Sequence, residues 1–244
     1  MRTDGRKLNE LREVIITPNY TDYPEGSVLI SFGKTKILCN ATILEEVPHW
    51  IITQGKDHGW ITAEYAMLPR STQQRSPRET LKPRGRTMEI SRLIGRSLRA
   101  AVNLKKLGRR TCILDCDVIQ ADGGTRTAAI TGGYIALALA LNKLVANEQI
   151  PDDTLHTEIA AVSTGVYNGS VMLDLCYEED SQADVDANIV MDGEGNFIEV
   201  QCTSEGKPFS RNTLDDLLNL ARGGISELIS TQRTFIHNFH QTDP

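Results

Sequence analysis

The sequence predicts a fold that combines helices with mostly antiparallel strands, and three observations predict it. Alternating apolar residues flank three tight turns, as in β-hairpins, at Gly33-Lys34, at Asn168-Gly169 and around residues 193–196. Apolar residues recur at helical spacing over 87–107 and over about 211–230. An alternating strand at 111–120 leads through two glycines into a strongly apolar helix over about 125–145.

The elements follow in a simple order. Strands are predicted over 26–33, 35–43 and 59–65, with residues 47–59 as a connecting loop. In the helix over 87–107, one face carries the apolar side chains Ile90, Ile94, Leu98 and Ala101. In the strand at 111–120, Cys112 and Cys116 alternate with Asp115 and Asp117, so we expect buried core thiols rather than zinc ligands.

Length and composition bound the class of protein. The chain has 244 residues, of which 40% are hydrophobic, so it can bury a sizeable core. We expect a single domain over 1–244, with a compact core at 1–230 and a frayed tail at 231–244. The longest apolar run, Tyr134 to Leu141, is too short to cross a membrane. Five scattered cysteines and no apolar leader after MRTDGRKLNE favour a protein of the reducing cytoplasm.

The charge is distributed very unevenly. The net charge of −6 argues against a nucleic-acid partner when it is read alone. Residues 70–110, however, hold thirteen Lys and Arg and only two acids, Glu79 and Glu89. A solvated, salt-bridged surface is the ordinary explanation of charge runs, but this window has too few acids to pair its cations. We therefore expect a polyanion-binding surface.

Two parts of this window carry the expected RNA contacts. Residues 71–86 lack apolar periodicity, which predicts a long basic loop that includes Lys82. Arg70 and Arg75 lie at its start. In the following helix, the side chains of Arg92, Arg96 and Arg99 lie opposite the apolar face and form an arginine stripe.

The stretch QADGGTRTAAITGG, residues 120–133, has the chemistry of an anion site. Two glycines precede a helix, so backbone N–H groups at the helix N-terminus are open to a ligand. Thr125 adds a hydroxyl and Arg126 adds a planar fork suited to phosphate oxygens. The stretch fits neither a Walker loop nor a dinucleotide fingerprint. A simple helix cap remains the alternative.

An acidic segment, EEDSQADVD, joins the two C-terminal hairpins. Its carboxylates include Asp180, Asp184 and Asp186. Clustered carboxylates in a turn bind hard cations, above all Mg²⁺ where phosphate is near. A solvated acidic loop is the alternative, and the spacing is not that of an EF-hand.

Together these features resemble a known family. The motifs that carry the resemblance are GWITAEYAMLPRST (59–72), GRTMEISRLIGRSLRA (85–100), LDCDVIQADGGTRTAAITG (114–132), EEDSQADVDANIVM (178–191) and ARGGI (221–225). They are similar, in order and over almost the whole chain, to bacterial ribonuclease PH.

The resemblance implies an α+β fold, a two-layer βαβα type like domain 2 of ribosomal protein S5. It implies a phosphate-dependent nucleotidyltransferase that trims the 3′ ends of tRNA precursors and other RNAs, including rRNA, and releases nucleoside 5′-diphosphates. The family's phosphate ligands fall on Arg86, Gly124, Thr125 and Arg126, and its catalytic, Mg²⁺-associated aspartates on Asp180 and Asp186. The resemblance also implies a homohexamer built as a trimer of dimers.

Two other functions compete with this expectation. One is a non-catalytic, RNA-binding ring subunit of an exosome-like assembly, which would have no need of Arg126, Asp180 and Asp186 together. The other is a small-molecule kinase of the same broad fold. A kinase needs a longer glycine-rich loop for ATP than GGTRTA supplies.

Overall fold

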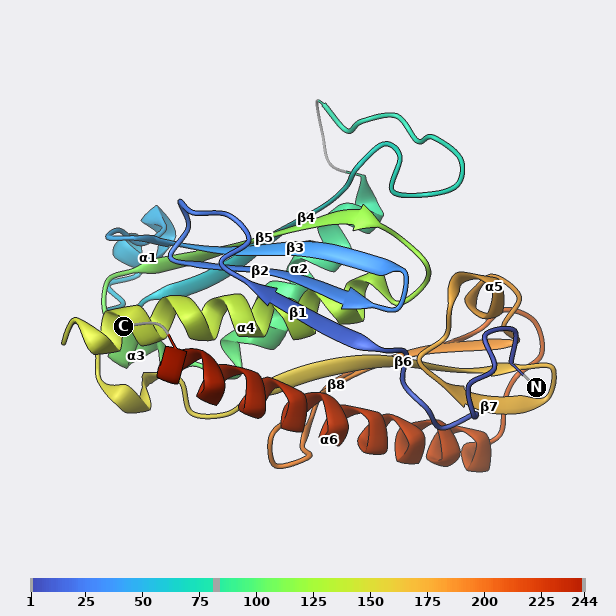
Figure 1. The fold of residues 1–244 in the computed structure, drawn as a ribbon. Helices are drawn as coiled ribbons and strands as arrows, with labels where there is room; N and C mark the ends of the chain where they lie inside the picture. Colours follow the sequence, from blue (N-terminus) through green and yellow to red (C-terminus); the bar gives the residue numbers. More distant parts are fainter. Residues whose placement is uncertain (1, 81–83, 243–244) are drawn as a thin grey trace.

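The computed structural model describes residues 2–80 and 84–242, so Lys82 of the basic loop and residues 243–244 of the expected tail lie outside the described residues. The chain forms two sheets and several helices (Figure 1). A five-stranded sheet has the order β1-β2-β3-β5-β4 and a four-stranded sheet has the order β7-β6-β8-β9. One large buried cluster takes members from both sheets and from the helices between them.

The first sheet confirms the predicted hairpin. Its strands are β1 (Val14–Pro18), β2 (Gly26–Phe32), β3 (Thr35–Leu44), β4 (Trp60–Met67) and β5 (Thr111–Gln120). All neighbours are antiparallel except β4 and β5, which run parallel because helix α2 crosses between them. As predicted, Cys112 and Cys116 on β5 are buried free thiols.

The second sheet is antiparallel throughout. Its strands are β6 (Ile159–Tyr167), β7 (Ser170–Leu173), β8 (Val185–Asp192) and β9 (Phe197–Ser204). At the turn between β6 and β7, Asn168 and Gly169 have φ of 50° and 71°. Positive φ at both central residues is the geometry of a tight hairpin turn, so this prediction is confirmed.

The helices differ from the expectations in two connections, described here, and at the C-terminus, described next. They are α1 (His49–Thr53), α2 (Gly85–Arg99), α3 (Leu104–Leu107), α4 (Thr125–Ala146), α5 (Tyr177–Asp180) and α6 (Arg211–Thr242), with a 3₁₀ turn, η1, at Asp152–Thr154. The connection at 47–59 contains α1 and is therefore not wholly a loop. The single helix expected over 87–107 is divided, because Val102 bridges to Leu155 and the Asn103 side chain caps α3.

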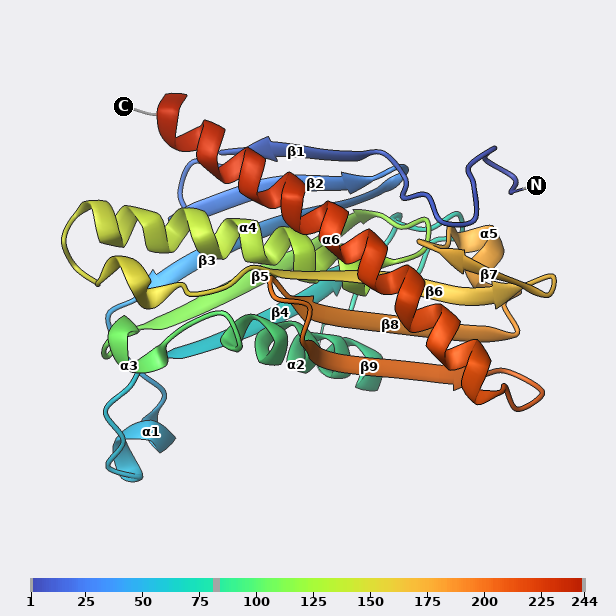
Figure 2. The same cartoon turned by 90° about the horizontal axis from the view of Figure 1, so that it is seen from below.

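The expectation of a frayed tail from residue 231 is wrong. Helix α6 continues to Thr242 and lies along the four-stranded sheet (Figure 2). Gln232 is buried and donates hydrogen bonds to the carbonyl oxygens of Thr131 and Ile159. Phe235 and Phe239 pack against the core, so the helix buries apolar surface beyond the predicted boundary.

Helix α4 is the central element of the core. It packs against β2, β3 and β5 of the first sheet and against β6 of the second. The helix is long and apolar enough to cross a membrane, but 83% of its most apolar window is buried, as in the core helix of a globular protein. The arrangement is the expected α+β fold of the S5 domain 2 type, with antiparallel and mixed sheets layered on helices (Figure 1).

Candidate active site

The glycine pair before α4 adopts a conformation that most residues avoid. Gly123 and Gly124 have φ of 76° and 64°, both in the left-handed region. A Cβ atom on Gly123 would lie 2.5 Å from the carbonyl oxygen of Leu175, in the segment that leads to α5. The two glycines therefore turn the backbone sharply. They also allow the turn before α4 to pack closely against residues 175–177, which precede and begin α5.

The N-terminus of α4 is prepared for an anion. Among the described residues no side chain caps it, and its first turn contains no acid. Arg126 instead places a positive charge beside the positive end of the helix dipole, an unfavourable arrangement that the half-exposed Glu89 carboxylate, 3.4 Å away, offsets only in part. Departures from local preference of this kind mark functional sites. The open N–H groups and this arginine together favour a bound phosphate.

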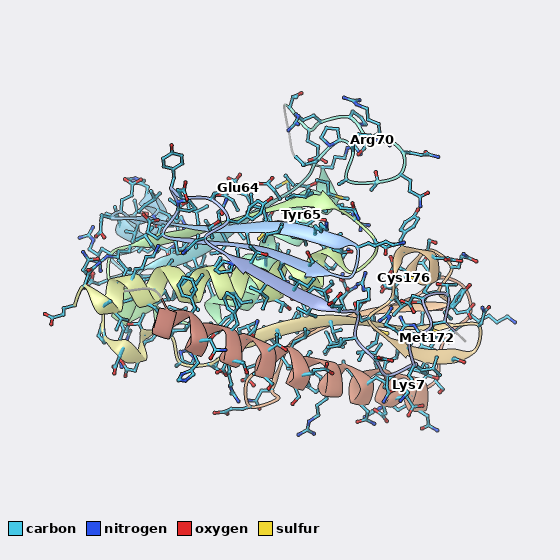
Figure 3. The ribbon with its side chains drawn as sticks, viewed as in Figure 1. Lys7, Glu64, Tyr65, Arg70, Met172 and Cys176 are labelled. Atoms are coloured by element: carbon cyan, nitrogen blue, oxygen red, sulfur yellow. The ribbon has the colours of Figure 1, made fainter. Side chains whose placement is uncertain are left out.

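Two side chains fix the residues of this turn. The Tyr65 hydroxyl lies 2.8 Å from Thr125 Oγ1. The Arg126 guanidinium donates to Gln201 Oε1 at 2.5 Å and lies 3.4 Å from Glu89 Oε1. Burial raises the pKa of Tyr65, so its hydroxyl stays protonated at neutral pH and can orient the threonine. Figure 3 labels Tyr65 among the strands of the first sheet.

The two predicted catalytic aspartates lie close enough to influence each other. Asp180 ends α5 and Asp186 is the second residue of β8. Burial and the neighbouring Asp180 raise the pKa of Asp186 to about 6, although Arg126 opposes the shift. Burial also raises the pKa of Asp180, against the pull of Arg86, Arg126 and Arg12. Both carboxylates are therefore attracted by Arg86 on α2 and by Arg126 in the turn before and into α4, which we call the phosphate turn (residues 123–126).

One carboxylate oxygen has no partner. Asp186 Oδ1 is buried without a hydrogen bond in the described structure, while Oδ2 is 3.5 Å from Asn188 Nδ2. A buried, unpartnered carboxylate oxygen costs free energy unless a ligand satisfies it. Hard oxygen donors of this kind suit Mg²⁺, which uses one or two carboxylates together with water and phosphate oxygens.

All six predicted phosphate and aspartate residues line one cleft of about 680 Å³. The set is Arg86, Gly124, Thr125, Arg126, Asp180 and Asp186. The structure therefore brings together residues from α2, α4, α5 and β8, which are distant in the sequence.

The acidic segment does not act as one cluster. Glu179 is buried and forms an ion pair with Arg2, while Asp184 is exposed and does not line the cleft. Glu205 lines the cleft in their place. Within residues 2–80 and 84–242 there is no group of three or more His, Cys, Asp or Glu side chains that could hold a metal ion. A Mg²⁺ ion would thus depend on Asp180, Asp186 and the substrate.

The expected RNA-contacting residues lie outside the cleft. Arg70 and Arg75 are exposed on the segment after β4 that projects from the body, where Figure 3 labels Arg70. The base of this loop is fixed, since Ser71 is buried and its carbonyl accepts from Ala121 N. Thr72 reaches the cleft, so the loop begins at its rim.

The arginines of the stripe on α2 differ in exposure and in their contacts with the rest of the fold. Arg92 and Arg96 are exposed, and Arg96 forms a 2.6 Å ion pair with Glu199. Arg99 is half-buried, lies 4.4 Å from the centroid of the Trp60 ring and donates to the Ile61 carbonyl. Of the three, Arg99 is therefore committed to the fold, which the helical spacing alone did not indicate.

Sequence reasoning missed residues that line the cleft or support its lining. Glu205, after β9, lines the cleft, while Tyr65 on β4 and Gln201 on β9 contact the lining residues Thr125 and Arg126. Tyr65 lies within the motif GWITAEYAMLPRST, which was the one available signal. Gln201 and Glu205 carry no local signal, because their proximity arises from the pairing of β8 with β9.

A helix N-terminus suited to an anion, on one cleft with two interacting carboxylates, has the geometry that phosphoryl transfer requires. The comparison with known families agrees. Residues 10–141 match the model of the 3′ exoribonuclease family, domain 1, and residues 157–224 match domain 2 of the same family. The chain belongs to the 3′ exoribonuclease family, which contains ribonuclease PH.

Solved structures share the fold at low identity. Rice (Oryza sativa) Rrp46 is 21% identical with a TM-score of 0.77, over 96% of this chain and 99% of that one. A subunit of the Archaeoglobus fulgidus exosome with RNA bound to the active site is 23% identical with a TM-score of 0.78, over 94% and 92%. A subunit of an archaeal exosome core is 22% identical with a TM-score of 0.74, over 95% and 91%.

Proposed function

We propose that this protein is a phosphorolytic 3′-to-5′ exoribonuclease of the bacterial ribonuclease PH type. It would trim the 3′ ends of tRNA precursors in the cytoplasm, with inorganic phosphate as co-substrate. The observation that carries the proposal is the gathering of the phosphate turn, Arg86 and the two aspartates on one cleft. Membership of the 3′ exoribonuclease family supports the same reaction class.

Phosphorolysis must bring two anions, inorganic phosphate and RNA, close together. The cleft would offset their repulsion with positive groups. Inorganic phosphate would rest on the N–H groups at the start of α4, between Arg126 and Arg86. Thr125, held by Tyr65, would complete the cradle. Such fixed positive groups lower the barrier because they need no reorganisation when charge develops.

The aspartates would act on the leaving group. An oxygen of inorganic phosphate forms a bond to the terminal phosphodiester phosphorus, and the bond to the 3′-oxygen of the preceding nucleotide breaks. That 3′-oxygen takes up a proton, and a nucleoside 5′-diphosphate leaves. Bound Mg²⁺ would neutralise charge on phosphoryl or leaving oxygens. Asp180 and Asp186 would hold the ion, or one of them would donate the proton.

The basic surfaces would hold the body of the RNA. Arg70 and Arg75 on the projecting loop would contact backbone phosphates of tRNA, which position a substrate without reading its sequence. Arg92 and Arg96 on α2 would be shared between RNA and a neighbouring subunit of a homohexamer. The likeness of the fold to subunits of exosomes, which are assemblies, supports an oligomer.

One assay separates this function from its competitors. The protein is incubated with 3′-extended tRNA, with and without inorganic phosphate. Release of nucleoside diphosphate that requires phosphate supports the proposal. RNA binding without release would indicate a non-catalytic ring subunit. ATP turnover that is indifferent to RNA would indicate a kinase.

A further inference from the structure

We propose that Arg2 and Arg12, two buried arginines of the N-terminal segment, are positioning residues for the active site. Arg12 would set the phosphate turn and Arg2 would set the helix that carries Asp180. The inference rests on the proposed function. Neither side chain lines the cleft, so both would act through the residues that do.

Arg12 joins the phosphate turn to the second half of the chain. Its guanidinium binds both carboxylate oxygens of Asp174, at 2.9 and 2.6 Å. The same group donates to the carbonyl oxygens of Asp122 at 2.6 Å and Gly123 at 3.4 Å. Thr35 supports the turn from β3, with its hydroxyl donating to the Gly123 carbonyl at 2.7 Å. The two carbonyls directly before Gly124 are thereby fixed.

The other end of this link is itself constrained. Asp174 has a φ of +50°, an uncommon value for a residue other than glycine. Its carboxylate accepts from the backbone N–H of Arg12 as well as from the guanidinium. A strained residue with such contacts is held by its surroundings rather than by its own preference.

Arg2 fixes the helix that ends in Asp180. It forms two hydrogen bonds with Glu179, at 2.8 and 2.6 Å, and both side chains of the pair are 0% exposed. Glu179 also accepts from the backbone N–H of Cys176, the N-cap residue of α5. A helix of four residues cannot be stable by itself, so its place depends on this pair.

The N-terminal segment is anchored along the same region. Arg2 also donates to the carbonyl oxygens of Leu173 and Asp174. The backbone N–H of Leu173 donates to the Leu8 carbonyl at 2.8 Å. In Figure 3, Lys7 lies beside the part of the chain that holds Met172 and Cys176. Residues 2–12 therefore form a brace beneath both loops of the active site.

The brace explains why buried charge is retained here. Replacing a buried ion pair by apolar side chains is often neutral for stability, so stability alone does not require the pair. Arg12 acts one residue from Gly124, and Arg2 acts through the residue before Asp180. Displacement of a reacting group by about 1 Å can lower turnover about a hundredfold.

The test compares two kinetic constants, kcat and the KM for phosphate, between variants of the full-length chain. A short single-stranded RNA is the substrate. Lysine keeps the charge of arginine but loses the planar fork. Arg12→Lys should raise the KM for phosphate about tenfold, while Arg2→Lys should lower kcat about tenfold with the KM for phosphate little changed. Arg233→Lys is the matched control, because Arg233 forms a bidentate pair with Glu158 away from the cleft.

A second variant covers the case in which a lone buried Glu179 prevents folding. Arg2→Met with Glu179→Gln leaves no unpaired charge, and glutamine still accepts from Cys176 N. This double variant should fold and show the same loss of kcat. Wild-type kcat and KM in all these folded variants would overturn the inference.

Failure of the proposed function can be told apart from failure of this inference. The proposed function is wrong if the wild-type protein releases no nucleoside diphosphate. In that case calorimetry with inorganic phosphate alone decides the inference. Affinity reduced about tenfold in Arg12→Lys, and unchanged in Arg233→Lys, supports the brace. Equal phosphate affinity in the two variants contradicts it.

Discussion

The hydroxyl of Tyr65, on the edge strand β4, lies 2.8 Å from Oγ1 of Thr125, the first residue of helix α4. Tyr65 is 3% exposed, so water does not compete for this hydrogen bond. The contact ties a sheet edge to the helix terminus at which phosphate is proposed to bind. It therefore orients one wall of the phosphate cradle.

Tyr65→Phe tests the contribution of this contact. The ring should still fill its site, so the protein should fold with a loss of about 1 kcal/mol for one hydrogen bond. The KM for phosphate should rise several-fold, because Thr125 is no longer oriented. Thermal unfolding and a phosphate titration measure the two effects. Tyr23→Phe is the control, since Tyr23 is 99% exposed. An unchanged phosphate KM would remove Tyr65 from the site.

The raised pKa of Asp186 predicts that the stability of the folded protein depends on pH. The folded pKa of Asp186, about 6, is above the ordinary value of 3.8, so the folded state holds the proton more tightly than the unfolded state. Stability should then fall as pH rises from about 4 to 6. Asp186→Asn should accordingly stabilise the metal-free protein at pH 7.5 by about 1–2 kcal/mol after allowance for solvent screening.

The gain from Asp186→Asn should vanish near pH 4, where aspartate is protonated in both states. Chemical denaturation at the two pH values measures it. Asp184→Asn, at an exposed position two residues earlier, should show no such difference. Equal stability of wild type and Asp186→Asn at pH 7.5 would contradict the burial of a charged carboxylate.

Substitution of either catalytic aspartate should abolish turnover and leave RNA affinity unchanged. Asp180→Asn and Asp186→Asn should each abolish nucleotide release, because the oxygen donors for a metal ion or proton are lost. RNA affinity, measured by fluorescence anisotropy without phosphate, should persist, since removing negative charge does not weaken binding to a polyanion. If affinity falls in step with turnover, the acidic segment has a structural role.

Much of this fold could be predicted from local patterns. Asn168-Gly169 and Gly33-Lys34 each specify a tight turn, and alternation on β5 placed Cys112 and Cys116 in the core. The end of α6 could not be predicted in this way. Residues after Ser230 mix polar and apolar side chains, and burial of Gln232 depends on carbonyl groups that α4 and β6 supply.

The site was predictable only where its residues carry local chemistry. Gly124, Thr125 and Arg126 are consecutive, so their role as an anion turn could be inferred from type and order. The pKa of Asp186 depends on burial by the surrounding fold and on Asp180, which no spacing rule supplies. Arg12 gave no signal, because its partners lie more than a hundred residues away in the sequence.

The projecting basic loop should control affinity for the body of tRNA. Arg70 and Arg75 are exposed on this loop, so their charges are within reach of RNA phosphates, although Arg70 also donates to the Gln73 carbonyl at 2.8 Å. Arg70→Ala with Arg75→Ala should flatten the slope of log affinity against log salt by roughly one to two units, since each contact contributes about 0.7 to 0.9. Trimming of a short oligonucleotide should change much less. A salt slope equal to that of the wild type would assign these charges to subunit contacts or folding.

The central claim is that phosphate bound at Arg126 attacks the 3′ end of RNA in this cleft. The most direct measurement supplies ³²P-labelled inorganic phosphate with 3′-extended tRNA and follows the label into product. The account predicts labelled nucleoside 5′-diphosphate from the wild type. Arg126→Ala should remain folded and lose this product even at high phosphate. Release of unlabelled nucleoside monophosphate, or wild-type labelling by Arg126→Ala, would contradict the account.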